Sequence, residues 1–361
     1  MENRAKEYAG IKYRLALIDM VYTLVLLIVL QMSGLAARLE SALLGLSGNQ
    51  FILTALYSAI IFLIYMILNF TLDFYRSFVV EHRFGLTKQK YSYWLSDHLK
   101  SNALGLTVFV ILVESFLFFA RSYPQSWWWM SALFWIFLSV IIAKIFPVIV
   151  IPIFFKYKKL ENEDLRQRIM SLAKVMRVRI LDVFEIDFSK KSLKANAAFV
   201  GMGKSRRVLL TDTLLNGKFL PEEIEMILAH EFAHYRFKHL IKMVIMNSAV
   251  IFLTFYIFFQ LDNRGLQARD ISNLGAWLFL FMVLQLLVTP LTNWISRIME
   301  HNADVAAIQV IGKRGSFVSM MEKLGEQNLA DRRPPLWAKI FFYDHPPIDE
   351  RIEYSLKAEE R

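Results

Sequence analysis

The sequence predicts a mainly α-helical, polytopic membrane protein with a small cytosolic α+β portion. Of its 361 residues, 56% are hydrophobic, and the mean hydropathy is +0.38, a balance that soluble domains rarely show. Six apolar segments are long enough to cross a bilayer, which takes about 20 residues of helix. Between the fourth and fifth segments lies a more polar stretch that carries both helix and strand patterns. Together these three observations argue against an ordinary soluble enzyme.

The six apolar segments alternate with polar connections. Their approximate bounds are Leu15 to Ala37, Gln50 to Asp73, Ser101 to Ala120, Trp127 to Lys156, Ile241 to Leu261 and Leu274 to Ile295. The first is too long for the core of a signal peptide and no clear cleavage site follows it, so we expect an uncleaved first span. The fourth is too long for one straight crossing, and we expect Pro147 and Pro152 to kink or end it near the surface.

The distribution of Lys and Arg sets the predicted orientation. With the N-terminus inside, the outer connections hold only four basic residues, Arg38, Arg121, Arg264 and Arg269. Nearly all the others fall on the inner side, which predicts that both termini are cytosolic. We therefore attribute the net charge of +10 to the cytoplasmic-side excess of Lys and Arg in a membrane protein, and we expect the lipid bilayer and no nucleic acid as a partner. Trp127, Trp128 and Trp129 follow an outer connection and predict an aromatic anchor there.

We divide the chain into four parts. Residues 1–156 hold the first four transmembrane helices, with a cytosolic loop at 74–100. Residues 157–240 form the cytosolic α+β portion. Residues 241–295 hold the last two transmembrane helices, and residues 296–361 form cytosolic C-terminal helices. The sequence carries no signal for an oligomeric state.

Two features of the membrane part stand apart from the apolar pattern. Glu114 and Lys144 lie inside predicted spans, where an unpaired charge is costly, so either they pair or they face a wet interior. The loop between the second and third spans reads E-H-R-F-G-L-T-K-Q-K-Y-S-Y-W-L-S-D-H. It is basic and aromatic, which suits a cytosolic loop lying against lipid headgroups, and it shows no catalytic pattern.

The soluble portion combines one helix with three strands. Apolar residues recur at helical spacing from Asp164 to Met176, and Val183 to Phe188 alternates as a strand does. Ala195 to Met202 and Arg207 to Thr211 suggest two further strands, joined through residues 203–205. An exposed edge of such a sheet can hold an extended peptide by main-chain hydrogen bonds. Plain scaffolding is the alternative.

The chemistry is indicated by the stretch from Ala229 to His239, A-H-E-F-A-H-Y-R-F-K-H. His230 and His234 share one face of a helix, and Glu231 lies about 100° round beside them. Two neutral imidazoles can bind zinc, and the glutamate is placed to take a proton from a water at the metal. This HExxH arrangement predicts catalytic zinc. The alternative is an ordinary amphipathic helix with two unliganded histidines.

The helix that carries this motif has a clear start and no clear end. Pro221 suits the first turn, and Glu222 and Glu223 lie by the positive end of the helix dipole. Nothing from Pro221 to Leu261 predicts a break, so we expect one helix to run into the fifth span. The seven residues after His234 cover about 10 Å, which would put the metal close to the cytosolic membrane surface.

A catalytic zinc needs a third protein ligand and an open position. His239 lies about 180° from His230 on a continuous helix, so it cannot join the pair without a break. Glu300 is the better candidate, because the sixth span delivers it to the same cytosolic surface where the fifth begins. His301 is the rival ligand, about 100° off that face, and we favour Glu300 over it.

Several polar residues near Glu300 are candidates for assisting roles. Asp304 lies one turn further on, positioned to accept the outer ring N–H of a ligating histidine and fix its tautomer. Arg297, one turn back, is a candidate to hold either carboxylate. In the later run Y-D-H-P-P-I-D-E-R, His345 and Arg351 are candidates to stabilise an oxyanion, and a surface turn made by the two prolines is the alternative.

Taken together, these motifs resemble the integral-membrane zinc metallopeptidases of the type I CAAX prenyl protease family, with the HtpX-type quality-control peptidases as more distant relatives. The resemblance rests on H-E-F-A-H-Y-R-F-K-H, S-R-I-M-E-H-N-A-D, K-A-N-A-A-F-V-G, R-V-L-L-T-D-T-L-L, R-F-G-L-T-K-Q and D-H-P-P-I-D-E-R. In this order and spacing they span about Arg83 to Arg351. The resemblance implies one Zn²⁺ per chain, held by His230, His234 and Glu300, with Glu231 as the general base.

The family pattern also implies where a substrate binds. It makes the peptide-binding edge the strand formed by Asn196, Ala197, Ala198 and Phe199. It makes His345 and Arg351 the transition-state helpers, and it implies a ring of membrane helices around a large internal chamber. Two departures stand out, because the family commonly has seven spans where six are visible here, and an aromatic residue where this chain has Ala198.

The expected function is a membrane-embedded zinc endopeptidase that cleaves peptide bonds by metal-activated water. Its substrates would be prenylated CAAX-type or other membrane-associated polypeptides. Quality control of membrane proteins, as in HtpX-type enzymes, is an alternative, and a polytopic transporter or scaffold with a structural metal site is a second alternative from another class. A compact chain without the first helix of the family favours a bacterial inner membrane over the endoplasmic reticulum, with the active site on the cytosolic face.

Overall fold

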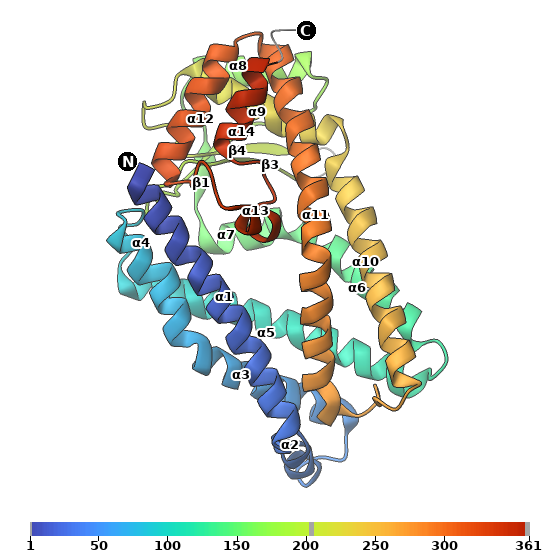
Figure 1. Cartoon of the computed structure of the whole chain (residues 1–361). Helices are drawn as coiled ribbons and strands as arrows, with labels where there is room; N and C mark the ends of the chain where they lie inside the picture. The colour runs from blue at the N-terminus through green and yellow to red at the C-terminus, as the bar shows by residue number, and fades with distance from the viewer. Residues whose placement is uncertain (1, 202–205, 358–361) are drawn as a thin grey trace.

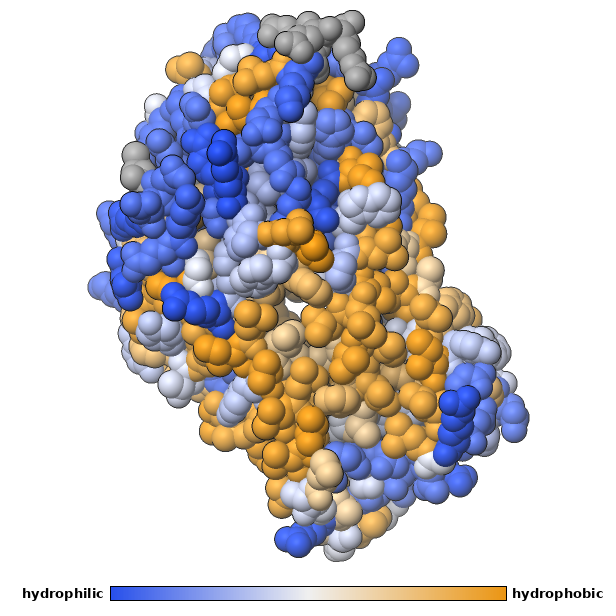
Figure 2. Space-filling view, viewed as in Figure 1, coloured by the Kyte–Doolittle hydropathy of each residue, from blue (hydrophilic) through white to orange (hydrophobic). Residues whose placement is uncertain are grey.

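The computed structural model describes residues 2–201 and 206–357, and it is mainly helical (Figure 1). Long helices fill one end of the molecule, and a compact portion with a small sheet fills the other (Figure 1). Figure 2 shows an apolar surface over the long helices, bounded at both ends by hydrophilic residues. This is the pattern of a protein that crosses a bilayer. The predicted end of one strand at Met202 and the turn at 203–205 lie outside the described residues.

Six helices in the described part of the chain are long and apolar enough to cross a membrane, as predicted. They comprise α1 (Glu2–Met32), α3 (Gln50–Phe74) with its continuation through α4 (Val80–Arg83), α5 (Tyr91–Ser122), α6 (Trp127–Ile145), α10 (His239–Asp262) and α11 (Leu274–Ile311). A shorter helix, α2 (Leu35–Leu44), links the first two. The fourth apolar segment is broken as expected, because α6 gives way to a π-helical turn at Phe146–Val150 and then to α7 (Ile151–Phe154).

One predicted membrane anchor is wrong. Trp127 faces the protein interior and not lipid, because it is fully buried and its ring contacts those of Phe116 and Trp277. Its indole N–H donates to Asp262 at 3.1 Å, which gives the buried polar atom a partner. Trp129 is exposed and remains available to a headgroup region. Three adjacent tryptophans cannot all face lipid on one helix, because successive residues are 100° apart.

The two charged residues inside the spans do not pair with each other. Glu114 is half-buried on α5, whereas Lys144 is exposed near the end of α6, and no ion pair joins them. Of the two expectations for these residues, an ion pair between Glu114 and Lys144 or a wet interior, the ion pair is therefore excluded.

The compact portion is built on a four-stranded mixed sheet. Its strands are β1 (Tyr157–Lys159), β2 (Val183–Ile186), β3 (Ala197–Val200) and β4 (Arg207–Thr211), in the order β1-β2-β4-β3. β2 and β4 run parallel, with Val183 opposite Val208, and the other two pairs are antiparallel. The three predicted strands are confirmed. β1 was not predicted because its three residues, Y-K-K, carry no apolar alternation.

Helices cover the sheet and carry the site. They are α8 (Glu163–Val175), α9 (Pro221–Arg236), α12 (Arg314–Asn328), α13 (Leu336–Phe342) and α14 (Ile348–Lys357). One apolar core joins α8, the sheet, α9, the C-terminal part of α11 and α12, with Ile169, Leu210, Phe232 and Phe317 at its centre. The HExxH helix is thus held by apolar packing on several sides.

Glu223 fastens the start of α9 to α12. Its side chain is 1% exposed and accepts hydrogen bonds from Ser319 Oγ at 2.6 Å, from Lys323 Nζ at 2.7 Å and from the Leu220 N–H at 2.7 Å. Burial alone would raise the pKa of this carboxyl, but the bonds from Lys323, Ser319 and Leu220 outweigh it and leave the pKa below its ordinary value. The charged form therefore stabilises the fold at neutral pH.

Glu223→Gln should lower the free energy of unfolding by about 3 kcal/mol, because it leaves Lys323 without its buried partner. The melting temperature of the purified protein in detergent measures the effect. Because the folded-state pKa is depressed, the difference from wild type should be full above pH 4.5 and shrink as the pH falls. Glu222→Gln is the control, since its ion pair with Lys313 is exposed to solvent and should contribute little to stability. Equal melting temperatures for the two variants would contradict the role of Glu223.

Candidate metal centre

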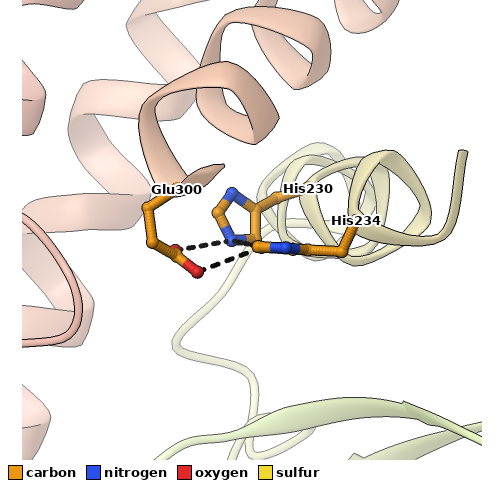
Figure 3. A group of neighbouring side chains, drawn as sticks. All are labelled: His230, His234 and Glu300. Atoms are coloured by element: carbon orange, nitrogen blue, oxygen red, sulfur yellow. Dashed lines mark hydrogen bonds and ion pairs between the residues drawn. The ribbon is translucent and has the colours of Figure 1, made fainter. Parts of the chain in front are cut away.

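The three predicted metal ligands meet where α9 and α11 pack together. Figure 3 shows His230 and His234 projecting from one helix toward Glu300 on the other. The Nε2 atom of His230 lies 3.1 Å from Glu300 Oε2, and the Nε2 atom of His234 lies 3.2 Å from Glu300 Oε1. The two Nε2 atoms are 3.0 Å apart. Within the described residues this is the group of imidazole and carboxylate donors spaced to hold one metal ion.

These distances fit zinc. Donors at about 2.0–2.2 Å from a tetrahedral Zn²⁺ lie roughly 3.3 Å from one another, close to the spacing found here. Burial disfavours a charged His230, but its hydrogen bonds to Asp304 and Glu300 outweigh burial and raise its pKa to about 9. The site therefore favours a cation, and three protein ligands leave a fourth position open.

Asp304 sets the orientation of His230. The Nδ1–H of the imidazole donates to Asp304 Oδ1 at 2.8 Å, which leaves the Nε2 lone pair aimed at Glu300. Asp304 is fully buried, and Arg351 donates to both of its oxygens, at 2.7 Å from Nε and 2.5 Å from Nη2. The α14 helix is thereby tied to α11 directly behind the ligand.

His234 also has a partner for its outer ring nitrogen, and a break in the helix that carries the HExxH motif brings that partner into place. The prediction of one continuous helix is wrong, because α9 ends at Arg236 and Lys238 takes a left-handed conformation with φ of 56°. The chain turns there, and His239 begins α10 with its Nδ1 atom 2.9 Å from Nδ1 of His234. If His234 turns its Nε2 atom to a metal, its Nδ1–H has a buried acceptor in His239. Neither glycine nor proline marks this break, so residue type alone does not predict it.

Two residues of α11, Arg297 and His301, do not take the roles considered for them at the metal site. Arg297 holds neither carboxylate, and instead its guanidinium donates to the carbonyl oxygens of Lys339 at 3.0 Å and Tyr343 at 2.7 Å. His301, the rival ligand, points away from the centre and packs its ring 4.4 Å from that of Tyr354. The arginine that holds Asp304 is Arg351 of α14, and residue spacing along α11 alone cannot predict a contact from another helix.

Glu231 and His345 line a cavity of about 250 Å³ beside the metal ligands. Burial raises the pKa of Glu231 above its ordinary range, which makes its carboxylate a stronger base. His345 is half-exposed, with Nε2 3.4 Å from Glu300 Oε2 and Nδ1 2.7 Å from Asp344 Oδ1. Burial opposes its protonation, but Asp344 and Glu300 outweigh it and raise its pKa, so it can donate a proton.

The edge strand β3 borders the same cavity. The Asn196 carbonyl accepts from the Thr211 N–H of the neighbouring segment at 3.1 Å. Because main-chain groups alternate in an antiparallel ladder, those of Ala197 and Phe199 face away from β4, toward the open edge. Just before the strand, Asn328 of α12 pairs with both main-chain groups of Ala195, at 2.9 and 3.2 Å. Asn328 therefore helps to hold the start of the edge strand in place, a role that the sequence analysis did not predict.

Asp304→Asn should weaken zinc binding by roughly 10- to 100-fold, because an amide orients His230 less firmly than a carboxylate does. Competition with a chelator, measured on the purified protein, reports this affinity. Asp349→Asn is the matched control, since Asp349 pairs with Arg332 and Arg333 away from the ligands. An affinity unchanged in Asp304→Asn, or reduced equally in both variants, would show that Asp304 does not position His230.

Comparison with known proteins finds family matches that cover both the part of the chain with the metal site and the part with the membrane helices. Residues 159–359 match the description "Peptidase family M48", and residues 2–156 match "CAAX prenyl protease N-terminal, five membrane helices". The described residues of that N-terminal region hold four long apolar helices and the shorter α2.

Individual relatives cover most of the chain. The uncharacterized metalloprotease YhfN of Bacillus subtilis is 28% identical over 98% of this chain and 85% of its own length. CAAX prenyl protease 1 of Saccharomyces cerevisiae is 29% identical over 79% of this chain and 68% of its own length. The CAAX prenyl protease 1 homolog of Arabidopsis thaliana is 30% identical over 77% and 67%, respectively.

The fold also has a solved counterpart. The crystal structure of S. mikatae Ste24p superposes with a TM-score of 0.86 over 97% of this chain and 88% of that one, at 24% identity. The mainly helical architecture with its small sheet is therefore shared. With the family match covering more than half of the sequence and the HExxH ligands assembled with Glu300, the chain belongs to peptidase family M48 and is a multi-pass membrane metalloprotease.

Proposed function

We propose that the protein is a zinc endopeptidase that cuts membrane-associated polypeptides, CAAX-type prenylated chains among them, at the cytosolic surface of a bacterial plasma membrane. The observation that carries this proposal is the open side of the ligand set, which shares one cavity with Glu231 and His345. A purely structural metal would be closed by a fourth protein ligand. A transporter or scaffold is set aside, because the chain belongs to a peptidase family.

The residues of the chain divide the catalytic work. Bound zinc would supply a Lewis acid at the scissile carbonyl and lower the pKa of a water. Glu231, made more basic by burial, takes the proton from that water and passes it to the departing amine. His345 and Arg351 line the cavity and donate to the developing oxyanion. Asp304 keeps His230 in the tautomer that ligation needs.

The substrate would lie along the edge strand as an added strand. The outward main-chain groups of Ala197 and Phe199 can pair with an extended peptide, and Asn196 and Ala198 complete this binding segment. Two cavities flank the strand, one of about 250 Å³ at the ligands and an apolar one of about 230 Å³ that Ala198 lines. Side chains of an extended peptide alternate between two faces, so both cavities have potential occupants. The small Ala198 leaves the apolar cavity open.

Topology supports the placement of this chemistry. The histidine ligands lie on α9 just before α10 begins, and Glu300 lies on α11 beyond the predicted end of the sixth span, on the side that the distribution of Lys and Arg predicts to be cytosolic. Relatives named CAAX prenyl protease 1 support a prenylated substrate, whereas the likeness to a bacterial metalloprotease favours other membrane-associated chains, as in quality control. A chamber enclosed by the membrane helices is part of this proposal, and Figure 2 shows a hollow in the face where α1 and α11 diverge.

Glu231→Gln should reduce peptide cleavage by roughly 10²- to 10⁴-fold, because the amide cannot accept the proton from water. Zinc content should stay at one per chain, because Glu231 is not among the ligands. Cleavage of a peptide substrate and metal analysis on the same preparation measure both. Glu225→Gln is the control on the same helix, since Glu225 pairs with Arg168 away from the cavity. Turnover that survives in Glu231→Gln would rule out the mechanism.

Substrate choice can be measured by competition between a farnesylated CAAX peptide, the same peptide without the lipid, and an unfolded membrane protein. A prenyl protease should cleave the farnesylated peptide at least roughly tenfold faster than the bare one, since burying even a few additional methylenes contributes about 0.8 kcal/mol each. If the bare peptide and the unfolded protein are cleaved equally well or better, the quality-control alternative replaces the prenyl protease.

A further inference from the structure

A second cavity, of about 620 Å³, lies away from the metal centre, where the membrane helices meet the sheet. It is bounded by the loop before α5, the first two turns of α5, the end of α7 and the turn after β2. Both α5 and the α6–α7 segment belong to predicted spans, so the cavity sits at the level where membrane ends and solvent begins.

Positive charge dominates this cavity. Lysines outnumber aspartates by six to two, the lining charges being Lys88, Lys90, Lys100, Lys156, Lys190, Lys191, Asp97 and Asp187. Asp97 pairs with Lys191 at 2.6 Å and lies 4.0 Å from Lys100, and Asp187 pairs with Lys190. Both aspartates that line the cavity are therefore already paired with lysines of the same lining.

Three lysines are left without a counter-charge. Lys88, Lys90 and Lys156 are exposed, and within the described chain no carboxylate forms an ion pair with them. Lys90 also occupies the N-cap position of α5, where no side chain caps the first turn, so free N–H groups and the helix dipole add to the positive potential. Such a concentration of unneutralised charge attracts an anion.

The opposite wall of the cavity is apolar. Pro152, Ile153, Phe154 and Phe155 form it, and Ile153 is 40% exposed. Lys191 lies over the ring of Phe155, 4.6 Å from its centroid, where the charged and apolar walls meet. A ligand that fits both walls carries a negative head and an apolar tail.

Hydrogen bonds tie the walls of this cavity together. Thr87 Oγ1 donates to the Lys191 carbonyl at 2.8 Å, and the Leu193 N–H donates to the Leu86 carbonyl at 2.8 Å. Gln89 donates to Asp97 at 2.8 Å, which holds the loop against α5. These bonds link the loop before α5 to the segment that leads into β3.

We propose that this cavity binds the headgroup of an anionic phospholipid, with phosphate against Lys88, Lys90 and Lys156 and the first acyl carbons against the wall at 152–155. An acidic peptide would satisfy the lysines but not the apolar wall at membrane level. None of these residues lines the cavity at the metal ligands, and Phe154 and Phe155 also line the apolar cavity beside β3, so a bound lipid would adjoin the proposed peptide-binding edge without touching the metal ligands. Bound lipid would fix the height of the sheet above the bilayer through the segment that enters β3.

The test compares lipid retention by native mass spectrometry on the full-length protein, titrated with phosphatidylglycerol or phosphatidylcholine in a neutral detergent. Wild type should retain phosphatidylglycerol in preference to phosphatidylcholine. The triple variant K88Q/K90Q/K156Q should bind it at least roughly tenfold more weakly, since it removes three basic residues that attract the anionic headgroup. The control K174Q/K218Q/K357Q removes the same charge from exposed positions outside the cavity and should bind as wild type does.

Equal losses in the two triple variants would overturn the proposal, because the effect would then follow net charge alone. Tighter binding of a soluble acidic peptide than of phosphatidylglycerol, lost in the pocket variant, would replace the lipid with a peptide ligand. A photoreactive phosphatidylglycerol analogue provides a measurement on wild type that needs no folded variant. Crosslinks concentrated at residues 88–100 or 152–156 support the site, and crosslinks spread evenly over the membrane helices contradict it.

Discussion

The structure depends on the meeting of two imidazoles from α9 with one carboxylate from α11. Nitrogen lone pairs and carboxylate oxygens at 3.0–3.2 Å repel one another unless a proton or a metal cation lies among them. Packing alone would not choose this arrangement, because the group is buried and polar. A bound metal would therefore add to the apolar packing that already joins the two helices. Each helix continues into a candidate membrane span, through the break at Lys238 for α9, so a bound ion would also tie two spans together.

Each histidine is oriented by a different device. Asp304, held by Arg351 from α14, fixes His230, and His239 faces His234 across the break between α9 and α10. The second device requires Lys238 to adopt a left-handed backbone, which costs roughly 1–2 kcal/mol for a residue with a side chain. The local sequence does not lower that cost, so the surrounding contacts must offset it. A turn at this point also lets α10 leave the site at its own angle, beside α6.

Periodicity and spacing predicted most of this architecture. Runs of apolar residues predicted the six spans, and alternation predicted β2, with β3 and β4 suggested as two further strands. The predicted topology of the fifth and sixth spans brought Glu300 to the HExxH histidines. What escaped prediction depends on tertiary contacts. Arg297 binds main-chain carbonyls of the α13 segment, Trp127 is buried by α10 and α11, and β1 is too short to show a period. The break after Arg236 follows from the packing of α10, because its residues are ordinary helix formers.

Metal analysis of the purified protein beside its Glu300→Ala variant, combined with X-ray absorption at the zinc edge, tests this account most directly. Wild type should hold one zinc per chain, with two imidazoles and a carboxylate in its coordination shell, and the variant should lose the metal while keeping its helical content. One zinc retained at full affinity without Glu300, or a coordination shell that lacks either imidazole, would contradict the claim that the ion joins α9 to α11.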